Sequence, residues 1–226
     1  MDTVAVTLNG SPAVGPAGIS ILELAREQGI QIPTLCFHSE LSLAGACRLC
    51  VVEVSGSRTL VASCHTPIAS NMVIQTHSPR VLKARTILVE LLLASHSGNC
   101  WSCDKANICE LRQIAADLGV GLPRFHSRKR HYALEEAGPY LVRDLNKCVQ
   151  CRRCVRACRE IKGAGLLSMA YRGFYCKLVA GADGPLEAEI CRDCGECVAV
   201  CPVGALTRTE ERFVRNKETP LVVTGG

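Results

Sequence analysis

The start of the chain alternates between apolar and polar residues in a way that predicts a β-hairpin followed by a short helix. Val4-Ala-Val-Thr-Leu-Asn-Gly10 alternates and ends in Asn-Gly, a dipeptide favoured in two-residue hairpin turns. Ser20 is followed three residues later by Glu23, which is a capping-box pattern for the start of an amphipathic helix. Gly29 provides the stop signal for that helix.

Two later apolar segments complete a small mixed domain. Residues 51–54 and 72–76 are rich in β-branched residues, which favour strands. Two hairpin strands, a helix and then further strands follow the order of a β-grasp arrangement. We therefore expect an N-terminal β-grasp domain over residues 1–77.

A helical segment is expected next, over residues 78–120. Ser78-Pro79 predicts a helix start, because serine caps a helix well and proline suits the first helical position. Apolar residues then recur at helical spacing as far as about Ser95. The members of this stripe are Val81, Leu82, Ala84, Ile87, Leu88, Leu91 and Leu92. A second short helix is expected over residues 109–118, where Gly119 ends it.

The rest of the chain divides into a linker, a duplicated domain and a tail. Residues 121–140 combine proline and glycine with basic residues and are interpreted as a linker. Within residues 141–210 a four-cysteine run occurs twice, which indicates a duplicated unit. Residues 211–226 are polar and are expected to form a tail. The fold class expected for the chain is α+β.

Sixteen cysteines among 226 residues are the most unusual feature of the composition. The mean hydropathy of +0.17 raises the question of a membrane span. The longest apolar run, residues 87–94, is interrupted by Glu90 and is far shorter than the roughly 18–20 residues that a span needs. No signal peptide is recognisable, so we expect a cytoplasmic protein without a membrane span. Because thiols stay reduced in that compartment, cysteines at this density indicate metal binding rather than disulfides.

The strongest chemical signal is the repeated run in the C-terminal domain. Each run has the form Cys-x2-Cys-x2-Cys-x3-Cys, which in bacterial ferredoxins holds two [4Fe-4S] clusters, with the fourth cysteine of each run ligating the other cluster. The first predicted set is Cys148, Cys151, Cys154 and Cys201, and the second is Cys158, Cys191, Cys194 and Cys197. Structural zinc sites are the alternative, since Cys-x2-Cys pairs also suit zinc. Arg159 stands where ferredoxins place proline, so a looser turn is expected there.

A second group of cysteines lies in the predicted β-grasp domain, with the spacing Cys36-x10-Cys47-x2-Cys50-x13-Cys64. The central pair and the distant last cysteine match the plant-type [2Fe-2S] pattern, whereas the first gap is longer than in that pattern. Small residues around the central pair let the backbone wrap closely around a cluster. A zinc ribbon is the alternative.

The third group is His96-x3-Cys100-x2-Cys103-x5-Cys109. The residues alone leave His96 open between a metal ligand and a histidine near a helix C-terminus, where the helix dipole stabilises it. Without His96 the group has three cysteines and no evident fourth ligand. Cys176 stands outside all three groups, and its apolar neighbours are typical of a buried, inert thiol.

Taken in order, three motifs resemble one known family. They are Ile32-Pro-Thr-Leu-Cys36, Gly45-Ala-Cys-Arg-Leu-Cys50 and the His96 motif that ends at Cys109. They resemble the iron–sulfur arm of the large subunit of respiratory NADH:quinone oxidoreductase, and equally the diaphorase iron–sulfur subunit of NAD-linked bidirectional hydrogenases. The N-terminal regions of iron-only hydrogenases and of some formate dehydrogenases are similar too. The resemblance extends to about residue 210.

This resemblance implies specific cofactors and partners. It implies a [2Fe-2S] cluster on the first cysteine group and identifies His96 as an iron ligand beside the cysteines of its own group. Together with the two ferredoxin-type clusters, the expected cofactors are one [2Fe-2S] and three [4Fe-4S] clusters. The implied function is the relay of single electrons between a flavoprotein subunit that binds NAD(P)H and a catalytic subunit, in the first place a hydrogenase. A formate dehydrogenase or an electron-bifurcating complex is the alternative.

No catalytic residue and no site for chemistry beyond electron transfer is recognisable. Gly163-Ala-Gly165-Leu-Leu-Ser168 is half of a dinucleotide-binding fingerprint and follows no clear strand, so neither a flavin nor an NAD site is expected. No cysteine follows Cys201, so we expect neither an iron-only hydrogenase domain nor nickel ligands here. Hydride chemistry is accordingly expected in another subunit.

The net charge of +5 does not by itself indicate a nucleic-acid partner. Basic residues beside the cysteines can offset the negative charge of clusters; the nearest are Arg152, Arg153, Arg156 and Arg159. A nucleic-acid-binding module would use the basic segment 124–131, where aromatic residues for base stacking are scarce, so no nucleic acid is expected. A diffusible polyferredoxin is the other alternative within electron transfer.

Overall fold

Two compact units make up the chain. The computed structural model describes residues 3–97, 99–125, 131–137, 141–185, 191 and 194–208. The first unit consists of Met1–Ser95, Glu110–Arg128 and Gln150–Arg152, and the second of His96–Cys109, Lys129–Val149 and Arg153–Gly226. The helical segment expected over residues 78–120 therefore contributes to both units. The expected tail, residues 211–226, lies outside the described residues.

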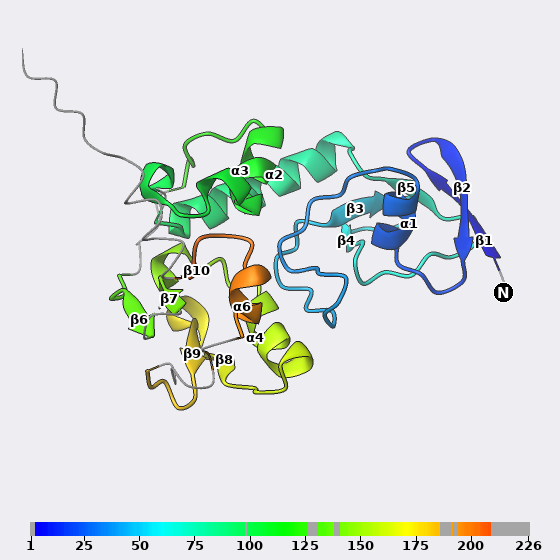
Figure 1. Ribbon diagram of the computed structural model, residues 1–226. Coiled ribbons are helices and arrows are strands. Elements are labelled where there is room, and N and C mark those ends of the chain that lie inside the picture. The colour runs from blue at the N-terminus through cyan, green and yellow to red at the C-terminus, as the bar shows by residue number, and fades with distance from the viewer. Residues whose placement is uncertain are drawn as a thin grey trace, which may run out of the picture. The chain divides into compact units, whose positions relative to one another are not determined.

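The first unit contains a five-stranded mixed sheet with the strand order β2-β1-β5-β3-β4 (Figure 1). Its strands are β1 (Thr3–Leu8), β2 (Ser11–Pro16), β3 (Val51–Val54), β4 (Val61–Ala62) and β5 (Val73–Gln75). β1 runs parallel to β5, and the other neighbouring strands are antiparallel. Helix α1 (Ile21–Glu27) shares one hydrophobic core with the sheet. These elements confirm the α+β class and the strands that the sequence predicts in this region.

Local sequence explains the first turn and the first helix. Asn9 and Gly10 adopt φ angles of 52° and 87°, the left-handed pair that a type I′ hairpin turn requires. At the start of α1, the Ser20 hydroxyl accepts a hydrogen bond from the Glu23 backbone N–H at 3.2 Å, and the Glu23 carboxylate accepts one from the Ser20 N–H at 2.8 Å. Gly29, at a φ of 73°, ends the helix as predicted.

Helix α2 (Pro79–Ser95) has the predicted limits but buries a different face. Its buried residues are Val81, Arg85, Val89, Glu90 and Ala94. Leu82 and Leu91, which belong to the apolar stripe that predicts the helix, are 38% and 47% exposed. Two charged residues occupy the buried face because each has a partner in the same unit: Arg85 donates to backbone carbonyls, and Glu90 accepts from Arg124.

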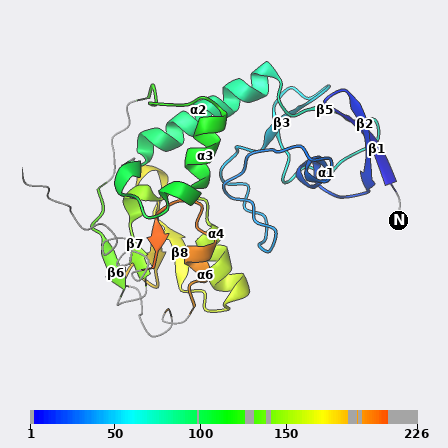
Figure 2. The ribbon, with the colours of Figure 1, turned by 45° about the horizontal axis from the view of Figure 1, so that its top comes forward.

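Helix α3 (Glu110–Asp117) packs beside α2 within the first unit (Figure 2). It ends at Gly119, whose φ is 64°, as the sequence predicts. The ion pair between Glu90 and Arg124 involves a residue at the start of the expected linker. Of the basic segment 124–131, residues 126–130 lie outside the described part of the chain.

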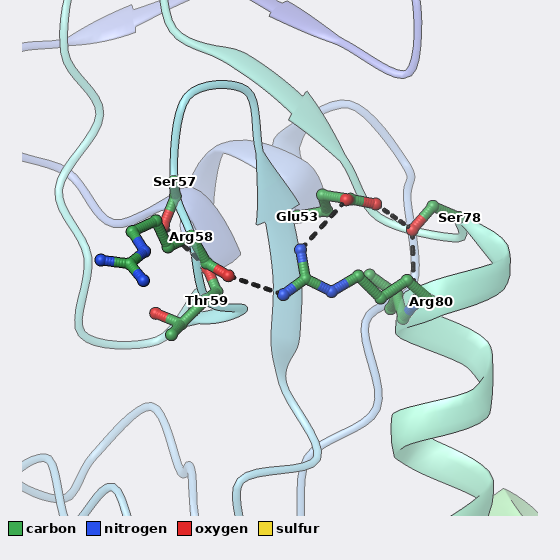
Figure 3. A network of polar contacts seen from close by, with 7 residues as sticks. Glu53, Ser57, Arg58, Thr59, Ser78 and Arg80 are labelled. Carbon is green, nitrogen blue, oxygen red and sulfur yellow. Dashed lines mark hydrogen bonds and ion pairs between the residues drawn. The ribbon is translucent and has the colours of Figure 1, made fainter.

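Polar contacts attach the first turn of α2 to strand β3 (Figure 3). The Ser78 hydroxyl donates to the Glu53 carboxylate at 2.5 Å. Arg80 donates to Glu53 at 3.4 Å and to the Arg58 carbonyl at 2.7 Å. The hydrogen bond from Ser78, with a further contribution from Arg80, lowers the pKa of Glu53. The start of α2 is thereby fixed to a strand of the β-grasp sheet.

The second unit contains two small sheets and a series of short helical turns. One sheet has the strand order β10-β7-β6, and β8 pairs with β9. The strands are β6 (Glu135–Ala137), β7 (Leu141–Arg143), β8 (Leu167–Ala170), β9 (Lys177–Ala180) and β10 (Leu206–Thr207). The helical elements are η1 (Cys100–Ser102), η2 (Ala106–Ile108), η3 (Leu145–Lys147), α4 (Arg153–Arg156), η4 (Ala157–Ile161), η5 (Gly173–Tyr175) and α6 (Glu196–Ala199).

Strand β6 lies inside the segment interpreted as a linker. It pairs antiparallel with β7, with Glu135 opposite Arg143. The buried Arg143 guanidinium forms an ion pair with the Glu135 carboxylate, in which the Nε–Oε2 distance is 3.0 Å. This cross-strand pair gives the short strand β6, within the expected linker, a defined place in a sheet.

None of the helices in the described part of the chain combines the length and the apolar character that crossing a bilayer requires.

Candidate metal-cluster sites

The N-terminal cysteine group is arranged as two pairs of thiols. Cys36, Cys50 and Cys64 are each 2% exposed, and Cys47 is half-buried. The Sγ atoms of Cys50 and Cys64 lie 3.3 Å apart, while Cys47 is hydrogen-bonded with Cys36. Two thiolates on one tetrahedral metal, at bond lengths of about 2.3 Å, lie roughly 3.7 Å apart. The donor set therefore fits two irons that each take two thiolates.

This pairing also controls the protonation of the thiols. The hydrogen bond between Cys50 and Cys64 lowers the pKa of Cys50 to about 6 and raises the pKa of Cys64. The hydrogen bond with Cys36, followed by burial, raises the pKa of Cys47.

The backbone between these cysteines takes conformations that allow a close wrap. Gly45 and Arg48 both adopt a φ of 60°. Glycine reaches this region without strain, whereas an arginine there costs roughly 1–2 kcal/mol. The Leu35 N–H donates to Cys47 Sγ at 3.4 Å, so at least one backbone amide is already directed at a sulfur.

A buried arginine supports the same loop from helix α2. Arg85 is 1% exposed, and its Nε donates to the Leu49 carbonyl at 3.1 Å and its NH2 group to the Val51 carbonyl at 2.8 Å. These carbonyls flank Cys50. Burial lowers the pKa of Arg85 to about 10, and the charge of Cys50 opposes that shift. The arginine therefore holds both neighbours of a candidate ligand and places a positive charge near its sulfur.

The third group lies in the second unit on two short 3-10 turns. His96 is 8% exposed, Cys103 and Cys109 are half-buried, and Cys100 is exposed. The chain after His96 is held by a hydrogen bond from the Ser97 N–H to the Asn146 carbonyl at 3.0 Å. His96 directly follows Ser95, the last residue of helix α2, so its position fits both a metal ligand and a histidine at a helix C-terminus.

Two contacts bring this group against the turn after Cys201. A Cβ added to Gly204 would stand 2.6 Å from Cys103 Sγ, so glycine is needed for this approach. The buried Lys105 ammonium donates to the carbonyls of Val198 and Cys201 at 2.6 and 3.2 Å. The third group and the second ferredoxin-type run are thus in direct contact within one unit.

Five of the eight ferredoxin-type cysteines lie at one hydrophobic core in the second unit, whereas Cys151 belongs to the first unit. Cys154 belongs to that core, and Cys148, Cys158, Cys197 and Cys201 pack against it. Burial, followed by the charges of Cys191, Cys194, Cys158 and Cys201, raises the pKa of Cys197 to about 12. The structure therefore brings Cys158 from the first run close to the second run, as the exchanged-ligand pattern requires.

Strand pairing also brings the two ends of the duplicated domain together. β10, which follows Cys201, pairs antiparallel with β7, which precedes Cys148. The Asp144 N–H donates to the Ala205 carbonyl at 2.9 Å next to this pairing. This arrangement places the fourth cysteine of the second run near the start of the first run.

The loop of the first run adopts unusual backbone geometry. Gln150 and Arg152, on either side of Cys151, have φ angles of 56° and 62°. Cys158 lies in the π-helical turn η4, which is where Arg159 replaces the proline of ferredoxins. Left-handed non-glycine residues and π turns are concentrated at functional sites, which agrees with cysteines arranged around a bound group.

Three family models match consecutive parts of the chain. A 2Fe-2S iron-sulfur cluster binding domain matches residues 1–79, the NADH-ubiquinone oxidoreductase-G iron-sulfur binding region matches residues 85–124, and the ferredoxin-like domain of NADH-quinone oxidoreductase subunit 3 matches residues 138–207. A chain in a crystal structure of NAD+-reducing [NiFe]-hydrogenase in the H2-reduced state matches with a TM-score of 0.85 and 30% identity, over 96% of this chain and 91% of that chain. The protein belongs to the iron–sulfur subunit family of NAD(P)-linked hydrogenases and NADH:quinone oxidoreductases.

Curated relatives agree with this family. The NADP-reducing hydrogenase subunit HndD of Solidesulfovibrio fructosivorans is 38% identical over 215 residues, which are 93% of this chain and 37% of that protein. The mitochondrial NADH dehydrogenase [ubiquinone] iron-sulfur protein 1 of Solanum tuberosum is 36% identical over 218 residues, which are 96% of this chain and 29% of that protein. The chain thus spans well under half the length of these two relatives. Family membership establishes [2Fe-2S] and [4Fe-4S] clusters as the cofactor types.

In the part of the chain that the structure describes, buried cations outnumber buried anions. Among the described residues the buried cationic side chains are Arg85, Lys105, Arg143, Arg153 and Arg156, and the one buried carboxylate is Glu90. Of the four arginines expected to offset cluster charge, Arg153 and Arg156 are buried, whereas Arg152 and Arg159 are exposed. The buried excess of positive charge suits anionic clusters.

Sequence reasoning missed three residues that shape these sites. Arg85 occupies a core-facing helical position, which is the signal that could have identified it. Lys105 and Gly204 lie near cysteines, but nothing in their spacing reveals their contacts. Cys176, expected to be buried, is half-buried, and neighbouring Phe174 is 46% exposed.

Proposed function

We propose that the chain relays single electrons between a flavoprotein subunit that reacts with NAD(P)H and a catalytic subunit, in the first place that of a hydrogenase. The main support is the likeness, over 96% of this chain, to a chain in the NAD+-reducing [NiFe]-hydrogenase structure. The same relay role in a formate dehydrogenase or an electron-bifurcating complex is the alternative. We place the complex in the cytoplasm.

The proposed cofactors are one [2Fe-2S] and three [4Fe-4S] clusters. The [2Fe-2S] ligands are Cys36, Cys47, Cys50 and Cys64. The ligands of the three [4Fe-4S] clusters are His96 with Cys100, Cys103 and Cys109; Cys148, Cys151, Cys154 and Cys201; and Cys158, Cys191, Cys194 and Cys197. The paired thiols of the first group support its set, and the core shared by Cys148, Cys154, Cys158, Cys197 and Cys201 supports the two ferredoxin-type sets.

When bound, such clusters supply one-electron redox chemistry, which divides a two-electron hydride event at a flavin into single-electron steps. The chain's own contribution is to hold the ligands, exclude water and balance charge. The 2% exposure of three ligands in the first group limits water access there. Ligand identity, hydrogen bonds to sulfur and burial then set each potential.

Metal analysis of the full-length chain, purified without oxygen, tests the cofactor part of this proposal. We expect about 14 iron atoms per chain with a comparable amount of acid-labile sulfide. Electron paramagnetic resonance during a reductive titration should resolve one [2Fe-2S] signal and several [4Fe-4S] signals. Zinc in place of iron, without sulfide, would overturn the proposal.

Analysis of the native complex tests the partner part. The complex that copurifies with a tagged chain should contain flavin, nickel and iron. Molybdenum or tungsten in place of nickel would assign the chain to a formate dehydrogenase. A chain that purifies alone, with all its clusters, would support a diffusible polyferredoxin instead.

A further inference from the structure

Lys105 lies buried between two of the proposed ligand sets. It is 7% exposed, and its ammonium donates to the Val198 carbonyl at 2.6 Å and to the Cys201 carbonyl at 3.2 Å. It stands between Cys103 and Cys109 in the sequence. All of these residues belong to the second unit. Lys105 therefore joins the histidine-containing group to the last ligand of a ferredoxin-type set.

The segment that carries Cys103 and Lys105 also lies close to the turn after Cys201. Gly204, three residues after Cys201, leaves no room for a Cβ beside Cys103 Sγ, since that atom would stand 2.6 Å from the sulfur. The Val198 carbonyl belongs to helix α6, and the Cys201 carbonyl to the turn that follows this helix. Removal of the lysine would therefore leave both carbonyls without this donor.

Hydrogen bonding alone does not explain a lysine at this position. Burial of an ammonium is unfavourable unless an opposite charge compensates it, whereas a neutral amide could donate to the same two carbonyls at a smaller desolvation cost. Within the described ranges, Lys105 makes no ion pair with a carboxylate. If the two adjacent ligand sets hold clusters, their thiolates supply the negative charge near Lys105. At an effective dielectric constant of about 20, two charges interact about fourfold more strongly than in water.

We propose that the positive charge of Lys105 raises the reduction potentials of the two clusters beside it. One of these clusters has His96 among its ligands, and the other has Cys201. Reduction adds an electron to each cluster, and a nearby buried cation stabilises the reduced form more than the oxidised form. This inference rests on the ligand sets proposed above. It assigns the lysine a role in matching the potentials of two neighbouring sites.

Three substitutions separate charge from hydrogen bonding. Lys105→Arg keeps the charge, Lys105→Gln keeps a donor without the charge, and Lys105→Met removes both. Lys162→Met is the matched control, because Lys162 is an exposed lysine of the same unit. Each full-length variant is purified without oxygen, its iron and sulfide are measured, and its clusters are titrated by electron paramagnetic resonance.

We expect the Gln and Met variants to shift the reduced-to-oxidised ratio of at least one adjacent cluster about tenfold toward the oxidised form at a fixed applied potential. For a one-electron couple this corresponds to a fall of about 59 mV. The Arg variant and the Lys162 control should titrate like the wild type. If the two neutral variants lose iron while the Arg variant retains both iron and wild-type potentials, the requirement for a cation is likewise supported.

Two results would overturn this inference. Gln and Met variants with full iron content and wild-type potentials would show that the charge has no influence. Loss of iron in all three variants, the arginine included, would show a purely steric role. A wild-type chain without iron and sulfide would instead remove the proposed function itself, and that outcome is recognised before any variant is compared.

Discussion

Replacement of Arg85 by methionine tests whether helix α2 supports the loop that carries Cys50. The guanidinium donates two hydrogen bonds, of 3.1 and 2.8 Å, to the carbonyls of Leu49 and Val51. Methionine matches much of the apolar stem but provides no donor. Each buried carbonyl that loses its partner costs about 1–2 kcal/mol. The loss for Arg85→Met should therefore be about 2–4 kcal/mol in the free energy of unfolding.

Urea unfolding of the full-length chain measures this loss. The visible circular dichroism of the [2Fe-2S] centre reports on the first unit, and far-ultraviolet circular dichroism reports on the chain as a whole. Arg80→Met is the matched control on the same helix. Arg80 is half-exposed and bonds to Glu53 and to the Arg58 carbonyl, so its replacement should cost less than about 1 kcal/mol.

The two substitutions should therefore differ clearly in their urea midpoints. Arg85→Met should also release the [2Fe-2S] centre at a lower urea concentration, because both residues that flank Cys50 lose their anchor. If Arg85→Met unfolds within about 0.5 kcal/mol of Arg80→Met, the two buried hydrogen bonds do not support the loop, and the reasoning fails.

Three further predictions concern other sites. His96→Cys should lower the midpoint potential of the middle cluster in a redox titration, because a thiolate adds negative charge where histidine is neutral. Gly204→Ala should reduce the signal of the same cluster, because the new Cβ would stand 2.6 Å from Cys103 Sγ. Glu90→Gln should destabilise the chain at neutral pH, because the hydrogen bond from Arg124 lowers the pKa of Glu90. The stability that ionised Glu90 contributes is complete above the ordinary carboxyl pKa. It is lost as the pH falls through the lowered pKa.

Each of these predictions has a result that would contradict it. An unchanged potential in His96→Cys would remove the histidine from the ligand set. Gly184→Ala is the control for Gly204→Ala, since a Cβ at Gly184 meets nothing within 4 Å; equal effects of the two would count against the steric argument. For Glu90→Gln, the difference from the wild type in acid unfolding should shrink below pH 4.5; a constant difference would show that the charge of Glu90 is irrelevant.

Local signals in the sequence predict the elements of the fold well. Asn-Gly, the capping box at Ser20 and the stop at Gly29 act through adjacent backbone atoms, so they need no tertiary information. The buried face of α2 could not be predicted in the same way. Arg85 and Glu90 are buried because partners 34–36 residues distant in the sequence satisfy them.

Cysteine spacing also predicts which cysteines belong to one site, but it does not predict the residues that surround each site. Spacing groups the cysteines, because a short loop limits how far apart their thiols can lie. The contact between Lys105 and the Cys201 carbonyl joins residues 96 positions apart. Nothing in the intervening sequence encodes that distance, so this part of the site required the structure.

The pairing of β7 with β10 has a consequence for how the protein is made. Arg143 and Leu206 are partners across this pair, so the sheet cannot close until both have left the ribosome. At a synthesis rate of about 5–20 residues per second, roughly 3–13 s separate the two. The central strand of the β-grasp sheet, β5, is in contrast complete once Gln75 has been synthesised. The sheet of the second unit therefore waits for the synthesis of β10, whereas the β-grasp sheet has all its strands once β5 has been made.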